Sequence, residues 1–322
     1  ELHYGERELT LSAQADSALR ALKRDHGVNV NAAIQGAWAC LLAAYTGRDE
    51  AVFGMVRGGR GTGVEGADGM VGMLINTVPV RVPLPAGARV IDVLRGIGQA
   101  NAAVLPHEHA ALPDVTRWSG LPQGAALFDT IVNYQPAAFD APLRGMLGRS
   151  FRLREHPGYP LTLVVTGDAP LRMRIDYDAE LFDAGAVDRM LDHVARLLEQ
   201  MAMDPGASIR SLDVMGPAER ARVVAEWNRT EAPYPADRCI HQLFEAQAAR
   251  TPDAVALVHE RASLTYRALN ERANRLAHHL VRRGVGPEVR VGICMERGVD
   301  MVVSILAVLK AGGAYVGMDP AY

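Results

Sequence analysis

The sequence predicts a mixed α/β (α+β) chain in which a linker joins two units. Three observations support this fold class. The stretch LRMRIDYD, residues 171–178, alternates apolar and polar side chains, as a strand does when only one of its faces is buried. Apolar residues recur at helical spacing from Val187 to Met201, behind a helix-capping side chain at Asp183. Residues 240–318 alternate between helix and strand patterns, which indicates the start of a parallel α/β sheet.

The first unit contains further elements ahead of these. Asn31 is a favourable helix N-cap, and apolar side chains follow it at helical spacing as far as Tyr45. Residues 89–104 show a second helical pattern. Apolar and alternating runs predict strands at residues 51–56, 77–82, 128–134, 150–156 and 161–165.

The composition changes after Met203. Residues 204–235 contain four prolines and no long periodic stretch, so they are typical of a linker, with one short helix at residues 217–227. The expected boundaries are therefore 1–203 for the first unit, 204–235 for the linker and 236–322 for the second unit. In the second unit, a helix from residue 240 is followed by a hairpin at 255–266, a helix at 266–283, a strand at 289–295, a helix at 299–310 and a strand at 314–318.

Composition excludes several classes of protein. Of the 322 residues, 49% are hydrophobic and 22% are charged, which suits chains with a sizeable core. The net charge of −3 offers no basic surplus for a nucleic acid partner. The apolar run at residues 301–309 is too short to span a bilayer, so no membrane association is expected. Cys40, Cys239 and Cys294 are far apart and form no CxxC motif, which argues against disulfides and zinc and favours the cytoplasm.

The adjacent histidines His278 and His279 invite comparison with acyl-transfer motifs that carry a histidine pair followed by Asp-Gly. Residues 266–283 have the spacing of an amphipathic helix, on which neighbouring side chains point about 100° apart. Two such rings cannot converge on one reacting group. Arg283 stands where the motif would need its aspartate, and Gly284 is a typical helix C-cap. The pair is therefore expected to be solvated and not catalytic.

Two other motifs lack the context that their chemistry needs. GTGVEG, residues 61–66, matches a dinucleotide-binding pattern, but residues 82–87 contain no acidic side chain for the ribose. His107 and His109 flank a glutamate, yet no third metal ligand can be named, so no metal is expected. His156 lies between strand patterns and could line a cleft, although a lone histidine is more often structural.

Several stretches of the first unit together resemble one known family. The motifs are YTGRDEAVFGMVRGGR (45–60), VGMLINTVPVRV (71–82, with Leu74 in place of an aromatic residue), HEHAALPDVTRWSG (107–120), LFDTIVNYQP (127–136) and YPLTLVV (159–165). On these motifs, residues 1–203 resemble the C-terminal half of a condensation domain of a nonribosomal peptide synthetase. REHPGYPL stands in loosely for a further motif of that family.

The rest of the chain resembles the junction that follows such a domain. ERARVVAEWNRTEAPYP (219–235) and IHQLFEAQAARTPDAVAL (240–257) are similar to the linker and opening of an adenylation domain. LTYRAL (264–269) matches the first adenylation motif with Ala268 in place of a glutamate, and LKAGGAYVGMDPAY (309–322) matches the second with Gly317 and Met318 substituted. The residues of these motifs expected to determine the fold, rather than to bind ATP, are Leu264, Thr265, Tyr266, Lys310, Gly312, Gly313, Asp319 and Pro320.

The resemblance implies a fold and a reaction. The first unit would be the C-terminal lobe of a chloramphenicol acetyltransferase-like condensation domain, and the second an incomplete N-terminal subdomain of the adenylate-forming fold. In such synthetases the amine of a carrier-bound aminoacyl thioester attacks a carrier-bound acyl or peptidyl thioester. The catalytic HHxxxDG motif is expected upstream of Glu1, so this sequence would hold no catalytic residue and would be inactive alone.

The resemblance also assigns residues and partners. Gly72, Asn76, Thr77 and His156 are expected to line one wall of the substrate tunnel, although Asn76 could equally well cap backbone groups. The cofactors would be 4′-phosphopantetheine on upstream and downstream carrier domains, with ATP and magnesium used only by a complete adenylation domain. The fragment itself would bind none of them, and its partners would be those carriers and the rest of the synthetase.

Two alternatives stay open at this point. One is a stand-alone acyltransferase of the acetyltransferase-like class, with His107, His109 or His156 as the general base. The other is a non-catalytic module that docks carrier domains. The order of the motifs and the linker favours the synthetase.

Overall fold

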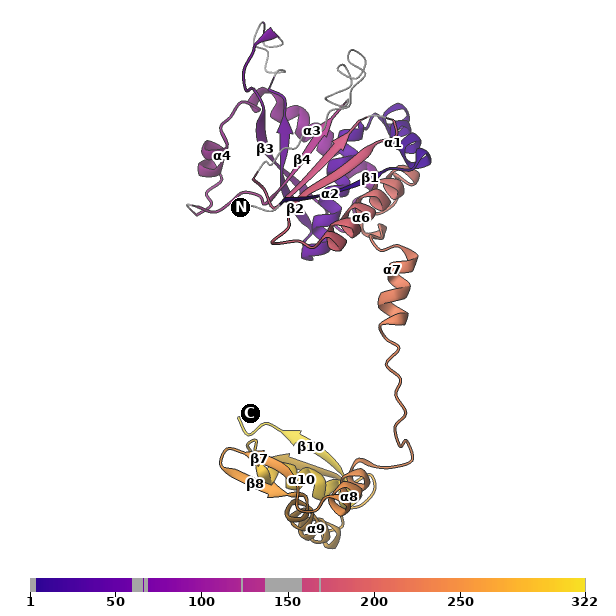
Figure 1. The fold of residues 1–322 in the computed structure, drawn as a ribbon, viewed down its shortest axis with the longest axis vertical. Helices are drawn as coiled ribbons and strands as arrows, with labels where there is room; N and C mark the ends of the chain where they lie inside the picture. The colour runs from indigo at the N-terminus through magenta and orange to yellow at the C-terminus, as the bar shows by residue number, and fades with distance from the viewer. Residues whose placement is uncertain are drawn as a thin grey trace. The chain divides into compact units, whose positions relative to one another are not determined.

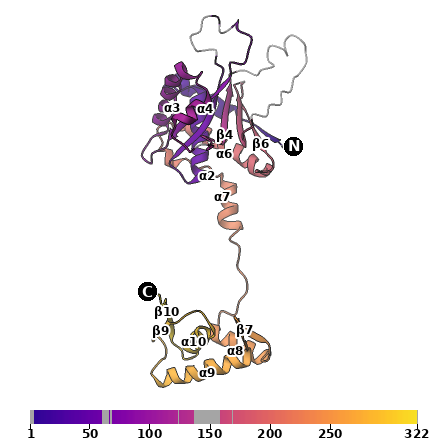
Figure 2. The ribbon, with the colours of Figure 1, turned by 90° about the vertical axis from the view of Figure 1, so that its left-hand side faces the viewer.

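The fold is known from a computed structural model. The structure describes residues 4–59, 66, 69–122, 124–136, 158–167 and 169–321. The chain forms two compact units, Glu1–Arg229 and Thr230–Tyr322 (Figures 1 and 2). The fold class expected from the sequence is confirmed. The expected domain boundaries at residues 203 and 236 stay predictions.

The described strands of the first unit form one mixed sheet. In sequence order they are β1 (Tyr4–Thr10), β2 (Glu50–Arg57), β3 (Asn76–Pro83), β4 (Thr130–Gln135), β5 (Leu161–Thr166) and β6 (Arg172–Asp178). Their order across the sheet is β1-β6-β5-β4-β2-β3. β4 pairs in parallel with both β2 and β5, and the other pairs are antiparallel. The strand expected at residues 150–156 lies outside the described residues.

Helices pack on the sheet and supply most of its core. They are α1 (Ala13–His26), α2 (Val30–Thr46), α3 (Val90–Val104) and α6 (Ala184–Met203); η2 (Leu105–His107) and α4 (Leu112–Trp118) follow α3 in the chain. α2 contacts both α3 and α6 as well as β2, and every residue from Ala32 to Leu41 is buried. The large core side chains include Trp38, Phe53 and Leu197. Helical burial on all sides indicates that α2 is the central helix of this unit.

The expected cap of α6 is confirmed. The side chain of Asp183 accepts a hydrogen bond from the backbone N–H of Ala186, and the apolar stripe from Val187 to Met201 is buried. The expected cap of α2 was wrong by two residues. Asn29 caps the helix by accepting from the N–H of Ala32 at 2.7 Å, whereas Asn31 already lies inside the first turn. Two asparagines at this spacing give the same sequence signal.

The strand β6 also differs from its expected pattern. Its polar face was expected to be wet, but Asp176 is only 6% exposed. β6 lies between β1 and β5, so its residues are covered from both sides. The carboxylate of Asp176 forms an ion pair with Arg174 at 2.8 Å, which compensates for its burial.

The chain after α6 packs back onto the first unit. The N–H groups of Val90 and Ile91 donate to the carbonyls of Ala207 and Pro205, at 2.9 and 2.8 Å. Ile209, in the 3₁₀ turn η3 (Ile209–Ser211), is buried in the core. The expected short helix follows as α7 (Pro217–Ala221), which continues into a π-helical turn, η4 (Arg222–Glu226).

The second unit contains a parallel strand pair covered by helices. Its elements are α8 (Ile240–Arg250), β7 (Val255–His259), β8 (Ala262–Thr265), α9 (Tyr266–Arg282), β9 (Arg290–Cys294), α10 (Val299–Lys310) and β10 (Ala314–Met318). β9 and β10 are parallel, which confirms the parallel α/β start, and β7 and β8 form the expected hairpin. Small residues, Ala277, Ala307 and Ala311, form a core cluster between α9 and α10. They allow the two helices to approach closely.

The described helices were also compared with the length and hydropathy of a membrane span. No single one of them is long and apolar enough to cross a bilayer. The pair α1 and α2, bent by 115° at their junction, passes the test of length and composition when taken together.

Candidate functional site

Asn76 lies at the start of β3, where the expected tunnel-wall motif enters the sheet. Its side-chain Nδ2 donates to two backbone carbonyls, those of Glu108 and Ala110, each at 2.8 Å. Its Oδ1 accepts from the N–H of Thr77 at 2.9 Å. Asn76 therefore ties β3 to the turn after η2. This geometry supports the structural reading of Asn76, because both amide hydrogens are already used by the backbone.

A buried polar cluster lies beside this tie. Arg57, the last residue of β2, pairs in register with Asn76 and donates to Oδ1 of Asn101 at 2.6 Å. Glu108 in the adjoining turn is only 3% exposed. Burial lowers the pKa of Arg57, and the negative charge of Glu108 opposes that shift. Sequence reasoning did not single out Arg57 or Asn101, because neither belongs to a motif.

Thr77 helps to fill the gap above a glycine in β2. A Cβ built on Gly54 would lie 2.4 Å from the ring of Phe128 and 2.7 Å from Cγ2 of Thr77. Phe128 in turn stacks on Tyr159, with ring centroids 5.5 Å apart. Gly54 is therefore required by close packing, and the aromatic pair covers this part of the sheet. The signal in the sequence was a glycine within a strand pattern.

The loop before β3 separates two glycines with different constraints. Gly59 has φ +68°, and a Cβ there would lie 1.9 Å from the carbonyl oxygen of Leu74, so only glycine fits. A Cβ on Gly72 would meet nothing within 4 Å. The loop exposes the apolar side chains of Val71 (104%) and Met73 (93%). Exposed apolar side chains of this size mark a surface that contacts another group.

The remaining histidines of the first unit do not form a metal site. His107 and His109 are exposed, whereas Glu108 between them is buried. Among the described residues no group of three or more His, Cys, Asp or Glu side chains could hold a metal ion. His156 and most of the GTGVEG stretch lie outside the described residues.

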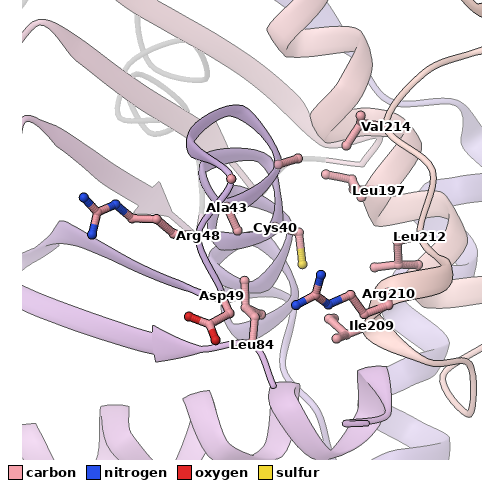
Figure 3. A pocket seen from close by; sticks show the side chains of 12 residues that line it. Cys40, Ala43, Arg48, Asp49, Leu84, Leu197, Ile209, Arg210, Leu212 and Val214 are labelled. Carbon is pink, nitrogen blue, oxygen red and sulfur yellow. The ribbon is translucent and has the colours of Figure 1, made fainter. Parts of the chain in front are cut away.

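A pocket of about 320 Å³ lies on the first unit between α2 and the segment after α6 (Figure 3). It is lined by Cys40, Ala43, Ala44, Gly47, Arg48, Asp49, Leu84, Leu197, Ile209, Arg210, Leu212 and Val214. In Figure 3 the guanidinium group of Arg210 reaches towards Cys40, and Arg48 extends away from it. Burial raises the pKa of the Cys40 thiol to about 12, so this thiol is a protonated, weakly nucleophilic part of the wall.

The adjacent histidines of the second unit are exposed on α9, as expected. The buried residues of that helix are Leu269, Ala273 and Ala277, and neither His278 nor His279 is among them. The N–H of Arg283 donates to the backbone carbonyl of His279, which closes the helix end. The prediction that this pair is solvated is confirmed.

The first adenylation-like motif forms a helix start. Thr265 caps α9 by accepting from the N–H of Ala268 at 3.2 Å. The ring of Tyr266 packs against Phe244 of α8 with centroids 5.8 Å apart. Lys310 lies over the same Phe244 ring at 5.8 Å and forms an ion pair with Glu245. Leu264 is half-buried and packs against the core of this unit. These contacts support a structural role for the motif.

The second motif forms the turn between α10 and β10. Gly312 has φ +82°, which favours glycine. A Cβ on Gly313 would lie 2.8 Å from Val285 and 3.1 Å from the carbonyl of Val289. Beyond β10, Asp319 accepts from the N–H of Ala321 at 2.9 Å and, with Pro320, lines an open pocket of about 390 Å³.

Comparison with protein families assigns both units. The model of the condensation domain matches residues 2–224, and the model of the AMP-binding enzymes matches residues 244–322. A linear gramicidin synthase protein from Brevibacillus parabrevis is 42% identical over 322 residues, covering 99% of this chain and 6% of the relative. Bacitracin synthase 3 from Bacillus licheniformis is 35% identical over 325 residues, covering 98% of this chain and 5% of the relative.

Solved structures show the same fold. One is holo-AB3403, a four-domain nonribosomal peptide synthetase bound to AMP and glycine. It matches with a TM-score of 0.77 at 20% identity, covering 99% of this chain and 26% of that chain. The first condensation domain of the calcium-dependent antibiotic synthetase matches with a TM-score of 0.53 at 18% identity, covering 66% of this chain and 47% of that one.

Together the fold and motifs define a piece of a multidomain synthetase, in which a condensation region is followed by the start of an AMP-binding domain. The chain belongs to the nonribosomal peptide synthetases. It spans only a small part, 6% and 5%, of the length of the two relatives named above.

Proposed function

We propose that the chain is part of a module that forms an amide bond between two carrier-bound thioesters. The first unit would supply one wall of the tunnel in which an aminoacyl amine attacks an acyl or peptidyl carbonyl. The support is the tie made by Asn76, which fixes β3, with Thr77 beside it, against the turn at residues 108–110. Its family motif and its backbone contacts coincide at one position.

The chemistry needs little more than positioning. An amine and a thioester react readily once they are held in line, and orientation can supply about 7–11 kcal/mol of the barrier. A rigid wall contributes by fixing where the substrate arms lie and by excluding water. The side chains of Asn76 and Arg57 would do this by holding the ends of β2 and β3 together with the η2 turn. Gly72 and His156 belong to the same proposed wall on the strength of the family motifs.

The second unit would be the beginning of the domain that activates the amino acid with ATP. Its own residues do not fit a nucleotide site. Residues 230–322 contain no Ser/Thr/Gly-rich loop ending in lysine, and the described residues hold no cluster of three metal ligands. We therefore assign no step of ATP chemistry to this unit. Leu264, Thr265, Tyr266, Lys310 and the glycines before β10 would serve its fold.

The proposed partners are the upstream and downstream carrier domains with their phosphopantetheine arms, together with the rest of the synthetase. The cytoplasmic location expected from the cysteines is part of the same proposal. Cys239 and Cys294 are exposed free thiols, and Cys40 is buried. Free exposed thiols suit a reducing compartment.

The structure offers less support for the two alternatives. A stand-alone acyltransferase would need a base oriented by a second group. His107 and His109 are exposed, and no hydrogen-bond partner of either ring exists among the described residues. A docking module would use the exposed loop around Val71 and Met73, and this function is compatible with a place in a synthetase.

The test compares amide formation by a synthetase module that contains these residues with that of its Asn76→Ala variant. Products are measured by mass spectrometry with loaded carrier domains, and amino-acid activation is measured by pyrophosphate exchange in the same samples. We expect condensation to fall at least about tenfold, because a displaced wall misplaces the reacting atoms. Pyrophosphate exchange should not change. Asn228→Ala, in the exposed segment after α7, is the matched control. Undiminished condensation by Asn76→Ala would refute the assigned wall.

A further inference from the structure

The helix α6 presents a polar stripe to the chain that leaves the first unit. His193, Arg196 and Gln200 are spaced three and four residues apart, so they lie on one side of the helix. All three form hydrogen bonds with the segment that follows η3, namely with Asp213 and Glu219. The stripe therefore guides the outgoing chain along α6.

The part of this segment up to Asp213 is held through its backbone. Gln200 donates to the carbonyl of Asp213 at 2.9 Å and accepts from its N–H at 3.0 Å. Arg196 adds a third hydrogen bond to the same carbonyl, also at 2.9 Å. Ile209 is buried a few residues earlier. This part of the chain is firmly attached.

The helix α7 is attached much less firmly. None of its residues is buried. Two of its side chains form ion pairs: Arg220 with Asp213 at 3.2 Å, and Glu219 with His193 at 2.7 Å. The first pair is largely exposed, with 56% and 36% of the side chains accessible, and such pairs contribute little. The contact with His193 therefore dominates the docking of α7.

His193 is unusually well placed to hold this contact. Its side chain is only 8% exposed, and both ring nitrogens are engaged. An ionised Glu219 can only accept, so Nε2 carries the proton and donates to it. In the neutral ring, Nδ1 then accepts from the hydroxyl of Tyr45 at 2.9 Å. Burial, and secondarily the charge of Glu219, raise the pKa of Tyr45, which keeps the phenol protonated as a donor rather than a nucleophile.

We propose that His193 is a latch that docks helix α7 on the first unit, and that its release frees the chain from residue 215 onwards. With the latch closed, the flexible segment between the units begins after η4. With the latch open, α7 and η4 join that segment and lengthen it. The inference does not depend on the proposed reaction, because it concerns only the attachment of α7.

The protonation state of the imidazole tunes this latch. The groups that face the ring are Tyr45 from α2 and Glu219 from α7, with Arg189 and Arg196 on α6 itself. Proton uptake leaves the Nε2–H bond to Glu219 in place and turns it into an ion pair, which is stronger. An imidazole gains its proton as the pH falls from 8 towards 5, so α7 docks more tightly on acidification until Glu219 itself is protonated.

Limited proteolysis of the full chain tests the latch. Trypsin can cut after Arg220 and Arg222 when α7 detaches, and after Arg229 and Arg238 in either state. The ratio of the first pair of cuts to the second, measured by mass spectrometry, reports the open population. We expect His193→Gln and Glu219→Gln each to raise this ratio about tenfold, which corresponds to the loss of one charge-assisted hydrogen bond. Tyr45→Phe should raise it less.

The controls separate a latch from a general loss of structure. His26→Gln changes an exposed histidine of α1 and should leave the ratio unchanged. Glu219→Gln alters no core residue, so it decides the matter if His193→Gln fails to fold. Lowering the pH from 8 to 6 should reduce the ratio in the original chain but not in His193→Gln. An unchanged ratio in Glu219→Gln, or a larger rise in Asp213→Asn than in Glu219→Gln, would overturn the proposal.

Discussion

The side chain of Gln200 exchanges two hydrogen bonds with the backbone of Asp213, as a neighbouring strand would. The two donor–acceptor distances are 2.9 and 3.0 Å. This pairing holds a segment with no regular secondary structure against α6, and it closes one side of the pocket that contains Cys40.

We expect Gln200→Leu to lower the free energy of unfolding of the first unit by about 1–3 kcal/mol, because it leaves both backbone groups of Asp213 without these partners. Urea unfolding followed by tryptophan fluorescence measures this unit alone, since Trp38, Trp118 and Trp227 all precede residue 230. Gln14→Leu, on the exposed side of α1, is the control and should change stability by less than about 0.5 kcal/mol. Equal effects of the two changes would contradict this account.

Two adjacent glycines should respond differently to a methyl group. Gly59→Ala places a Cβ 1.9 Å from the carbonyl of Leu74 at a positive φ, so we expect a loss of at least about 1–3 kcal/mol. Gly58→Ala meets nothing within 4 Å and should be nearly neutral. The same fluorescence assay compares them. A neutral Gly59→Ala variant would show that the loop relaxes away from Leu74.

The ion pair between Lys310 and Glu245 is asymmetric. The lysine side chain is 4% exposed and the glutamate side chain 45%. Glu245→Gln leaves a buried ammonium without its counter-charge, so we expect it to destabilise the second unit by about 1–2 kcal/mol. Lys310→Met keeps the packing on Phe244 and should cost less than about 1 kcal/mol. Hydrogen exchange of peptides from residues 240–318, read by mass spectrometry, ranks the two variants, and the reverse order would contradict the argument.

The three thiols should differ in reactivity with pH. At pH 8 we expect iodoacetamide to modify the exposed Cys239 and Cys294 readily and Cys40 hardly at all, because the pKa of Cys40 is about 12. A raised pKa means that the folded state holds its proton longer than the unfolded state. The stabilising contribution is therefore complete below about pH 8.5, the usual thiol pKa, and is lost as the pH rises towards 12. Mass mapping of the alkylated peptides checks the order, and early modification of Cys40 in the folded chain would contradict it.

Much of this fold could be predicted from local sequence patterns. Asp183, followed by a regular apolar stripe, defines α6 without ambiguity, and the helices of the second unit end within a few residues of their expected limits. Asn31 shows where such patterns fail, because Asn29 offers the same capping group two residues earlier. Asp176 shows a second limit. Alternation along a strand does not reveal how many strands cover it.

The candidate site was only partly predictable. The motif drew attention to Asn76 and Thr77, but spacing could not show that the Asn76 side chain spans to the carbonyls of Glu108 and Ala110. Arg57 and Asn101 come together only because β2 ends beside α3. The role of His193 was hidden as well, since in the sequence it interrupts an apolar stripe and its partners Tyr45 and Glu219 are distant. Contacts between remote segments depend on tertiary packing, which local periodicity does not encode.

The pairing of β1 with β6 has a consequence for biosynthesis. Tyr4 lies opposite Asp178, so the first strand of the sheet must wait for nearly the whole unit before its partner exists. At about 5–20 residues per second, a ribosome needs roughly ten seconds or more to supply that partner. Until then the nascent segment of residues 4–10 has no native neighbour, and a chaperone would meet it in that interval.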